Sequence, residues 1–139
     1  MKIVTSLITL AWICALAPCW AQSNMAIVGR IPFEFTVDNL TLPAGEYTGW
    51  EITQGVYAMD NANGDRRTFL AYPVAVNEPG LAQLVFRKYG DKYFLAEVWN
   101  PLRDRVMSFG KCRKERELVT SRLVSGLRVD RVVVLARVR

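Results

Sequence analysis

LAQLVFRKYGDKYFLAEVW, residues 81–99, is the stretch that decides the fold of this 139-residue chain. Two runs rich in Val, Phe, Tyr and Leu, residues 81–89 and 92–99, flank the dipeptide Gly90-Asp91. A two-residue connection that begins with glycine suits the tight turn of a β-hairpin, because glycine adopts the positive φ that such turns require. The stretch therefore predicts a β-hairpin within a β-rich fold.

Short runs of the same kind fill the chain on the N-terminal side of this hairpin. In residues 33–38, three apolar side chains alternate with three polar ones, so one face of the predicted strand is apolar. Residues 61–65, with the sequence NANGD, predict a turn, and Pro73 implies an edge position or a bulge in the run that contains it. The other predicted strands cover residues 40–42, 46–52, 56–60 and 66–76.

Beyond the hairpin the spacing of apolar residues becomes helical over residues 111–124. Gly126 predicts the end of this helix, and residues 127–138 predict a final strand. Residues 132–136 of that strand, VVVLA, are apolar at consecutive positions. This pattern is typical of a central strand that is covered on both faces.

Eight or so short strands with one late helix predict a mainly β fold. We expect a compact antiparallel β-sandwich or a small barrel, with one helix in the C-terminal region. An outer-membrane barrel is the competing architecture, but its strands are about ten residues long and carry a continuous lipid-facing apolar band. The early runs of this chain are too short for such a barrel.

The first 21 residues, MKIVTSLITLAWICALAPCWA, predict an export signal that is cleaved after Ala21, which leaves residues 22–139 as the mature chain. Their apolar stretch, residues 3–16, is shorter than the roughly twenty residues that a bilayer core needs, which argues against a transmembrane anchor. The sequence before Cys19 approaches a bacterial lipobox, so lipid anchoring through Cys19 stays an alternative. Without such an anchor, we expect residues 22–139 to form a single β-rich domain in the periplasm or outside the cell, with no transmembrane segment.

Charge divides the mature chain into two parts. Residues 22–102 hold six Lys and Arg against nine Asp and Glu, a net charge of −3, whereas residues 103–139 hold eleven against four, a net charge of +7. On an exported protein this basic end favours an anionic envelope polymer, a glycan or another envelope protein over nucleic acid as a partner. The alternative is a solvated face whose charge only keeps the protein soluble.

The absence of histidine excludes the usual Ser-His-Asp and Cys-His nucleophiles and the common zinc sites. Loss of the leader leaves Cys112, which we expect to be a buried, small apolar side chain. We therefore expect no cofactor, no metal and no catalytic residue. Paired carboxylates alone can cleave glycosidic bonds. The candidates, each interpreted as a solvent-facing strand or turn residue, are Glu34, Glu46, Glu51, Glu97 and Asp104.

Aromatic side chains form the most suggestive cluster for binding. Strict alternation along residues 92–99 places Tyr93, Leu95, Glu97 and Trp99 on one face and Phe94, Ala96 and Val98 on the other. If the Phe94 face is core, Tyr93, Glu97 and Trp99 lie on an accessible surface that suits sugar rings or a protein partner. Burial of both faces is the alternative. Three basic side chains of the predicted helix complete the candidate binding surface: Arg113, Lys114 and Arg116.

Four segments carry a resemblance: residues 31–35 (IPFEF), 42–48 (LPAGEYT), 84–99 (LVFRKYGDKYFLAEVW) and 114–118 (KEREL). In this order they resemble a family of small exported proteins of environmental bacteria whose function is unknown. The resemblance spans nearly the whole mature chain, but it implies no substrate, cofactor or catalytic residue. Relatives tend to have a serine just before the basic helix, where this chain has Cys112.

Two classes of function follow from these observations. The preferred one is a non-enzymatic module that binds or supports envelope or extracellular material through its basic end, an aromatic face or an open strand edge. The alternative is a hydrolase or lyase of glycans or acidic polymers that uses paired carboxylates. A lipocalin-like carrier of a small ligand is a weaker alternative, because it needs a barrel interior that its own side chains do not fill.

Overall fold

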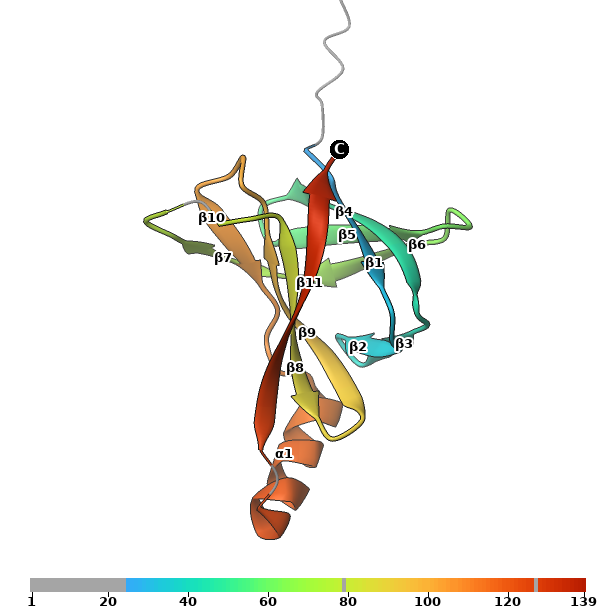
Figure 1. The fold of residues 1–139 in the computed structure, drawn as a ribbon, viewed down its shortest axis with the longest axis vertical. Coiled ribbons are helices and arrows are strands. Elements are labelled where there is room, and N and C mark those ends of the chain that lie inside the picture. Colours follow the sequence, from blue (N-terminus) through green and yellow to red (C-terminus); the bar gives the residue numbers. More distant parts are fainter. Residues whose placement is uncertain (1–24, 79, 127) are drawn as a thin grey trace, which may run out of the picture.

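The computed structural model describes residues 25–78, 80–126 and 128–139 (Figure 1). The predicted export signal, its cleavage site and Cys19 lie outside the described residues, as does Leu127 at the start of the predicted final strand. The described chain is mainly β with one helix, which confirms the predicted fold class.

Strands make up most of the described chain, and the predicted hairpin of residues 81–99 corresponds to two of them, β8 and β9. A helix, α1 (Arg113–Ser125), lies between the last two strands. The strands are β1 (Ile27–Ile31), β2 (Phe35–Val37), β3 (Leu40–Leu42), β4 (Gly45–Thr53), β5 (Val56–Asn61), β6 (Arg66–Leu70), β7 (Tyr72–Ala75), β8 (Gln83–Tyr89), β9 (Lys92–Trp99), β10 (Arg105–Ser108) and β11 (Val129–Val138).

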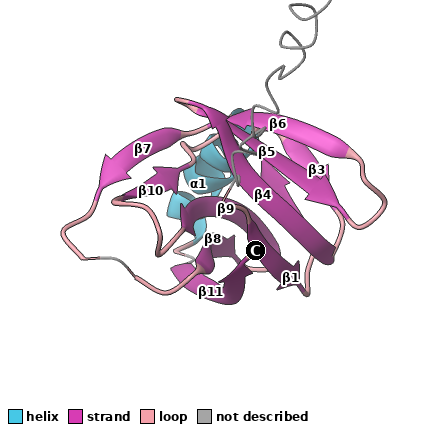
Figure 2. Ribbon diagram, turned by 90° about the horizontal axis from the view of Figure 1, so that it is seen from above, coloured by secondary structure: helices cyan, strands magenta, loops and turns pink. Residues whose placement is uncertain are grey.

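One curled sheet contains these strands, in the order β3-β2-β9-β8-β11-β1-β4-β5-β6, and β10 pairs with both β9 and β7. The pairing of β2 with β9 is parallel, and the other pairings among the described residues are antiparallel. Only Ala71 separates β6, which pairs with β5, from β7, which pairs with β10. This bent segment connects the two sides of the sheet, so the strands enclose a common interior (Figure 2).

One apolar cluster, the main core, fills this interior. It takes inward-pointing side chains from most strands, including Ile27, Ile31, Phe35, Tyr47, Tyr57, Met59, Phe69, Leu84, Phe86, Leu95, Val98, Met107 and Phe109. Burying each of the larger side chains contributes about 1.5–3 kcal/mol to folding. Because side chains of the described residues fill the interior, the open cavity of a lipocalin-like carrier is not found among them.

A smaller apolar cluster lies between the β8–β9 hairpin and α1, and an ion pair is buried beside it. Glu115 of α1 is only 1% exposed. Its carboxylate accepts hydrogen bonds from Nε and Nη2 of Arg87, at 2.5 and 2.9 Å, and from the hydroxyl of Tyr89 at 2.8 Å. Arg87 also donates to the carbonyl oxygen of Phe109 at 3.2 Å. These bonds fix α1 to the sheet, and Cys112 is buried in the same cluster, as predicted.

A bulge in β9 breaks the strict alternation of its side chains. Opposite the consecutive residues Val85 and Phe86 of β8, β9 supplies Glu97 and Leu95, so Ala96 is an additional residue. An additional residue moves every side chain beyond it to the other face of the strand.

The bulge overturns the predicted aromatic face. Tyr93 and Val98, on either side of the additional residue, both contact the main core. Glu97 and Trp99 therefore lie on the outer face of the sheet, and the prediction that they share a face with Tyr93 is wrong.

The final strand also differs from its prediction. β11 is central in the sheet, since it pairs with both β8 and β1. Its inner face contacts the main core, but Val133 and Leu135 on the outer face are 41% and 69% exposed. The consecutive apolar residues therefore do not indicate cover on both faces.

Smaller differences concern the ends of elements and two short strands. The helix begins at Arg113 rather than at residue 111 and ends at Ser125, where Gly126 adopts the left-handed conformation with a φ of 70°. β1 and β10 were not predicted. Pro73 lies in β7, which pairs with β10 alone among the described strands, so its predicted edge position is confirmed.

Candidate functional site

Two concave sites lie at opposite ends of β9. The first, which we call the groove, lies between the β2–β3 hairpin, the start of β9 and α1, and has a volume of about 330 Å³. The second, which we call the barrel-end pocket, lies where β9 ends and β10 begins, and has a volume of about 30 Å³. Residues 33–36, Thr41, 91–94, Lys114 and Leu118 line the groove.

The turn between β2 and β3 is tied to the start of α1. Asp38 and Asn39 have φ values of 46° and 65°, as the type I′ turn of a two-residue hairpin requires. The side-chain oxygen of Asn39 accepts a hydrogen bond from the backbone amide of Lys114 at 3.2 Å. It satisfies one of the free amides at the start of α1, where Cys112 supplies no side-chain cap. Two walls of the groove are thus held together.

Two stacked aromatic rings form the apolar part of the groove. The ring centroids of Phe33 and Tyr93 are 3.7 Å apart and the ring planes are 13° from parallel. Phe33 in turn meets Phe86 of the main core edge to face, at 5.0 Å between centroids. The ammonium group of Lys88 lies 5.5 Å from the centroid of the Tyr93 ring, within the range of a cation–π contact. The core therefore holds the aromatic surface in place.

Four exposed charged side chains surround these rings in the groove: Glu34, Asp91, Lys92 and Lys114. The exposed face of α1 continues from Lys114 and carries Arg113 and Arg116. Arg113 is paired with Glu117 at 2.9 Å, and both side chains are exposed. The groove itself is therefore balanced in charge, whereas the helix face beside it is basic.

The structure brings together only part of the predicted binding surface. Tyr93 and Lys114 line the groove, and Arg113 and Arg116 lie on the adjoining helix face.

Glu97 and Trp99 form a separate pair on the outer face of the sheet. The indole nitrogen of Trp99 donates to the Glu97 carboxylate at 2.7 Å. A guanidinium nitrogen of Arg131 lies 3.8 Å from the same carboxylate. The Trp99 ring packs so closely on Gly80 that a Cβ atom there would lie 2.7 Å from it. This pair therefore does not contribute to the groove.

The barrel-end pocket contains an incompletely bonded ion pair. Nη2 of Arg105 on β10 donates to Oε2 of Glu51 on β4 at 3.3 Å. The Glu51 side chain is only 10% exposed, so its prediction as a solvent-facing residue is wrong. Within residues 25–78, 80–126 and 128–139, neither Oε1 of Glu51 nor Nε of Arg105 has a hydrogen-bond partner, and both atoms are buried.

Tyr57 lines the same pocket, and its ring lies across Gly49. A Cβ atom at Gly49 would lie 2.7 Å from both Cε1 and the hydroxyl oxygen of Tyr57, so glycine is required for this approach. Burial raises the pKa of the Tyr57 hydroxyl far above its usual value, and the charge of Glu51 raises it further. The hydroxyl therefore stays protonated at neutral pH.

Sequence reasoning missed Tyr57 and Arg105 as site residues. Glu51 was a candidate only as one of several carboxylates. The available signal was Gly49, because a glycine inside a predicted strand indicates that another group approaches the backbone closely.

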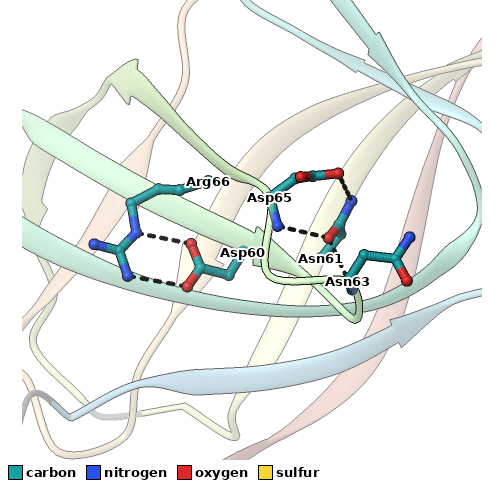
Figure 3. A network of polar contacts seen from close by, with 5 residues as sticks. All are labelled: Asp60, Asn61, Asn63, Asp65 and Arg66. Carbon is teal, nitrogen blue, oxygen red and sulfur yellow. Dashed lines mark hydrogen bonds and ion pairs between the residues drawn. The ribbon is translucent and has the colours of Figure 1, made fainter.

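A polar network closes the connection between β5 and β6 (Figure 3). Asp60 accepts two hydrogen bonds from Arg66, at 2.9 and 3.1 Å. The side-chain oxygen of Asn61 accepts from the backbone amides of Asn63 and Asp65, at 2.9 and 3.0 Å. The turn predicted at residues 61–65 is thus confirmed, and its polar side chains serve the turn itself.

A scan against models of protein families found no match to the chain, and searches of curated proteins and of solved structures found none either. In the part of the chain that the structure describes, no helix has the length and apolar character needed to cross a membrane. The same residues contain no group of three or more side chains from His, Cys, Asp and Glu that could hold a metal ion.

Proposed function

We propose that this protein is an exported, non-enzymatic binding module that holds an anionic glycan-type polymer of the cell envelope. The observation that carries the proposal is the groove, which joins an ordered aromatic pair to a basic helix face. An extended polymer with sugar rings and negative charges would contact both parts at once.

The aromatic part suits the ring of a sugar. Phe33 and Tyr93 stack on each other, and Phe33 also meets Phe86 edge to face, so little side-chain entropy is lost when a ligand binds. Thr36 and Thr41 line the same groove and supply hydroxyl groups. Such a combination of aromatic and hydroxyl side chains favours a ligand with apolar ring faces and polar edges.

The basic part suits the charges of the polymer. Lys114 joins the groove, which is balanced in charge, to the helix face, where Arg113 and Arg116 outnumber the one acidic residue, Glu117. Exposed charges interact weakly and are screened by salt. We therefore expect weak binding that depends on ionic strength.

The test uses residues 22–139 on an immobilised anionic polysaccharide. Retention should fall steeply between low and physiological salt. Replacing Arg113, Lys114 and Arg116 together by Gln should weaken binding about tenfold, because each exposed ion pair contributes roughly 0.2–1 kcal/mol.

A matched control removes the same charge elsewhere, by replacing the exposed residues Arg67, Arg128 and Arg137 by Gln. This control should keep at least half of the affinity. Equal retention of the two triple variants would show that net charge alone is responsible, and it would reject the groove as the site.

The enzyme alternative keeps one specific observation in its favour, since two carboxylates, Glu34 and Asp91, line the groove. Both side chains are exposed, whereas a general acid is usually activated by burial. Release of reducing ends from a neutral or acidic glycan, abolished by Glu34→Gln, would support hydrolysis. Binding without turnover supports the module.

A further inference from the structure

β6 is an edge strand of the sheet (Figure 1), and among the described strands it pairs with β5 alone. Two hydrogen bonds show which of its residues face β5. The backbone amide of Asn61 donates to the carbonyl oxygen of Asp65 at 3.1 Å, just before β6. The amide of Ala71 donates to the carbonyl oxygen of Gly55 at 3.0 Å, just after it. Since every second residue of an antiparallel strand bonds to the same partner, the odd-numbered residues of β6 bond to β5.

The even-numbered residues of β6 therefore direct their backbone groups to the open edge. These residues are Arg66, Thr68 and Leu70. Each has one amide donor and one carbonyl acceptor. A row of such groups is a template on which another strand can form hydrogen bonds.

The other two edges of the described sheet offer less. In β7, the amide of Val76 donates to the carbonyl oxygen of Asp104 at 3.1 Å, so the same alternation turns Pro73 towards the open edge, where it has no amide to donate. β3 has three residues and pairs with β2 through a two-residue turn, so Thr41 alone directs its backbone groups outward. β6 is therefore the edge that best accepts a strand.

Side chains along β6 make one end of this edge basic. Arg66 and Arg67 begin the strand and lie on opposite faces of it. Arg66 pairs with Asp60 through two of its five N–H groups. Within residues 25–78, 80–126 and 128–139, no carboxylate pairs with Arg67, which is exposed.

The other end of the edge is apolar. Leu70 is 65% exposed and Tyr72, just beyond it, is 63% exposed. Together with Phe109 and Cys112 they line a hollow of about 140 Å³. An added strand would meet apolar surface here and positive charge at the opposite end.

We propose that β6 binds an extended segment of another protein as an added antiparallel strand, and that this segment is apolar in its N-terminal half and acidic in its C-terminal half. The antiparallel direction places the start of the segment beside Leu70 and its end beside Arg66 and Arg67. This edge is separate from the groove, so the proposal does not depend on the binding of a polymer there.

A second copy of this chain complements the edge less well. Two β6 strands paired antiparallel about Thr68 would place Arg66 opposite Leu70 and Arg67 opposite Phe69. Neither arginine would then meet a carboxylate, although opposite charges across a strand pair stabilise it. Charge complementarity therefore favours an acidic segment from a different protein.

The test titrates residues 22–139, labelled with nitrogen-15, with the peptide acetyl-SVLTEES-amide. Two control peptides are SVLTKKS, in which the charge is reversed, and SEETLVS, in which the order is reversed. We expect the first peptide to shift the amide signals of residues 66, 68 and 70 with a dissociation constant of about 1 mM. Each control should bind about tenfold more weakly, because the carboxylates no longer meet the arginines.

Amide hydrogen exchange distinguishes an added strand from other contacts. When four fifths of the protein carry the peptide, exchange at residues 66, 68 and 70 should slow about fivefold, because only the free fraction exchanges. Exchange at residues 67 and 69, which already bond to β5, should hardly change.

Two variants test the charge and the backbone separately. Arg67→Glu should weaken binding of SVLTEES about tenfold and strengthen binding of SVLTKKS. Arg137→Glu, an equal charge change at an exposed position of β11, should change neither affinity more than about twofold, because salt screens distant charges. Thr68→Pro removes the central donor of the edge without removing a bond to β5, and it should abolish binding. Thermal unfolding shows whether each variant folds, and Arg67→Glu alone suffices for the test.

Three outcomes would overturn the proposal. The first is that SVLTEES shifts none of the three signals at about 10 mM, well above the expected dissociation constant. The second is that the three peptides bind equally well, or that folded Arg67→Glu binds them as the parent protein does. The third is that residues 66, 68 and 70 are protected from exchange without peptide and the protein has the mass of a dimer in light scattering, which would assign the edge to a second copy.

Discussion

Each end of the barrel contains a glutamate, an arginine and a tyrosine, but the hydrogen bonding of the ion pair is complete at one end only. At the end covered by α1, Glu115, Arg87 and Tyr89 form a buried set in which the carboxylate accepts from both partners. At the other end, the Glu51–Arg105 pair beside Tyr57 retains an unpaired oxygen and an unpaired nitrogen within the described chain. The complete set attaches a helix, whereas the incomplete set leaves two buried polar atoms unpaired. Side-chain identity alone therefore does not determine how completely an ion pair is hydrogen-bonded.

Glu115→Gln should have the largest effect on stability. Removing one charge of a buried pair leaves Arg87 uncompensated and typically costs about 3–5 kcal/mol. Urea unfolding at neutral pH, followed by tryptophan fluorescence, measures the loss.

Two matched variants sharpen this comparison. Glu117→Gln removes an exposed carboxylate on the same helix and should cost no more than about 0.5 kcal/mol. Glu51→Gln, the same change at the other end, should cost about 1 kcal/mol or less, because Glu51 makes a single bond to a partly exposed arginine. Equal losses for Glu51→Gln and Glu115→Gln would abolish the distinction between the two ends.

Gly49→Ala should have the next largest effect, at the barrel-end pocket. The new Cβ atom would lie 2.7 Å from the Tyr57 ring, so the ring must move, at a cost of about 1–3 kcal/mol. Thermal unfolding measures the change. Gly110→Ala is the control, since the nearest atom there would be 3.8 Å away, and it should stay within about 0.5 kcal/mol of the parent protein.

Tyr89→Phe should have a smaller effect than Glu115→Gln in the same buried set, and its effect should depend on pH. Burial and the hydrogen bond to Glu115 raise the pKa of Tyr89 from 10.0 to about 12. Because the folded-state pKa is the higher one, the stability linked to this proton is complete below pH 10 and is lost as the pH rises towards 12.

At neutral pH the variant should lose about 1–2 kcal/mol with the hydrogen bond. Above pH 10 its stability should fall less steeply than that of the parent protein, which urea unfolding at several alkaline pH values would reveal. Parallel slopes for the two proteins would contradict the role of Tyr89 in the complete set.

Much of the fold was predictable because its signals are local. The β8–β9 hairpin follows from Gly90-Asp91 between two apolar runs, and the end of α1 follows from Gly126. β10 was missed because it has four residues with only two apolar ones between Arg105 and Ser108, which is too short for a period to show.

The bulge in β9 was missed for a different reason. The additional residue, Ala96, is apolar like its neighbours, and the register of β9 against β8 is set by the pairing of two strands rather than by the composition of one. Because of the bulge, the predicted binding residues are divided. Tyr93 and Lys114 line the groove, whereas Glu97 and Trp99 lie on the outer face of the sheet. Export of the chain and its resemblance to a bacterial family stay predictions.

The sequence does not predict the barrel-end pocket, because its ion pair joins two residues that are far apart in the chain. The bent segment of β6 and β7 connects the side of the sheet that contains β4 to the side that contains β10. This connection places Glu51 of β4 within hydrogen-bond distance of Arg105 of β10. A pair on one helix, such as Arg113 and Glu117, can be inferred from spacing. A pair formed by closure of a sheet requires the order of the strands.

β1 and β11 lie at opposite ends of the described chain but pair in the sheet, with Ile27 opposite Val138. This pairing determines when during synthesis the sheet can be completed. The seam between these strands cannot form on the ribosome until almost all of the described chain has emerged, so the sheet stays open during most of synthesis. Pairings of such long sequence separation make folding slow. We propose that the chain is exported. Slow completion of the sheet would then favour export, because an unfolded chain can pass through a narrow translocation channel.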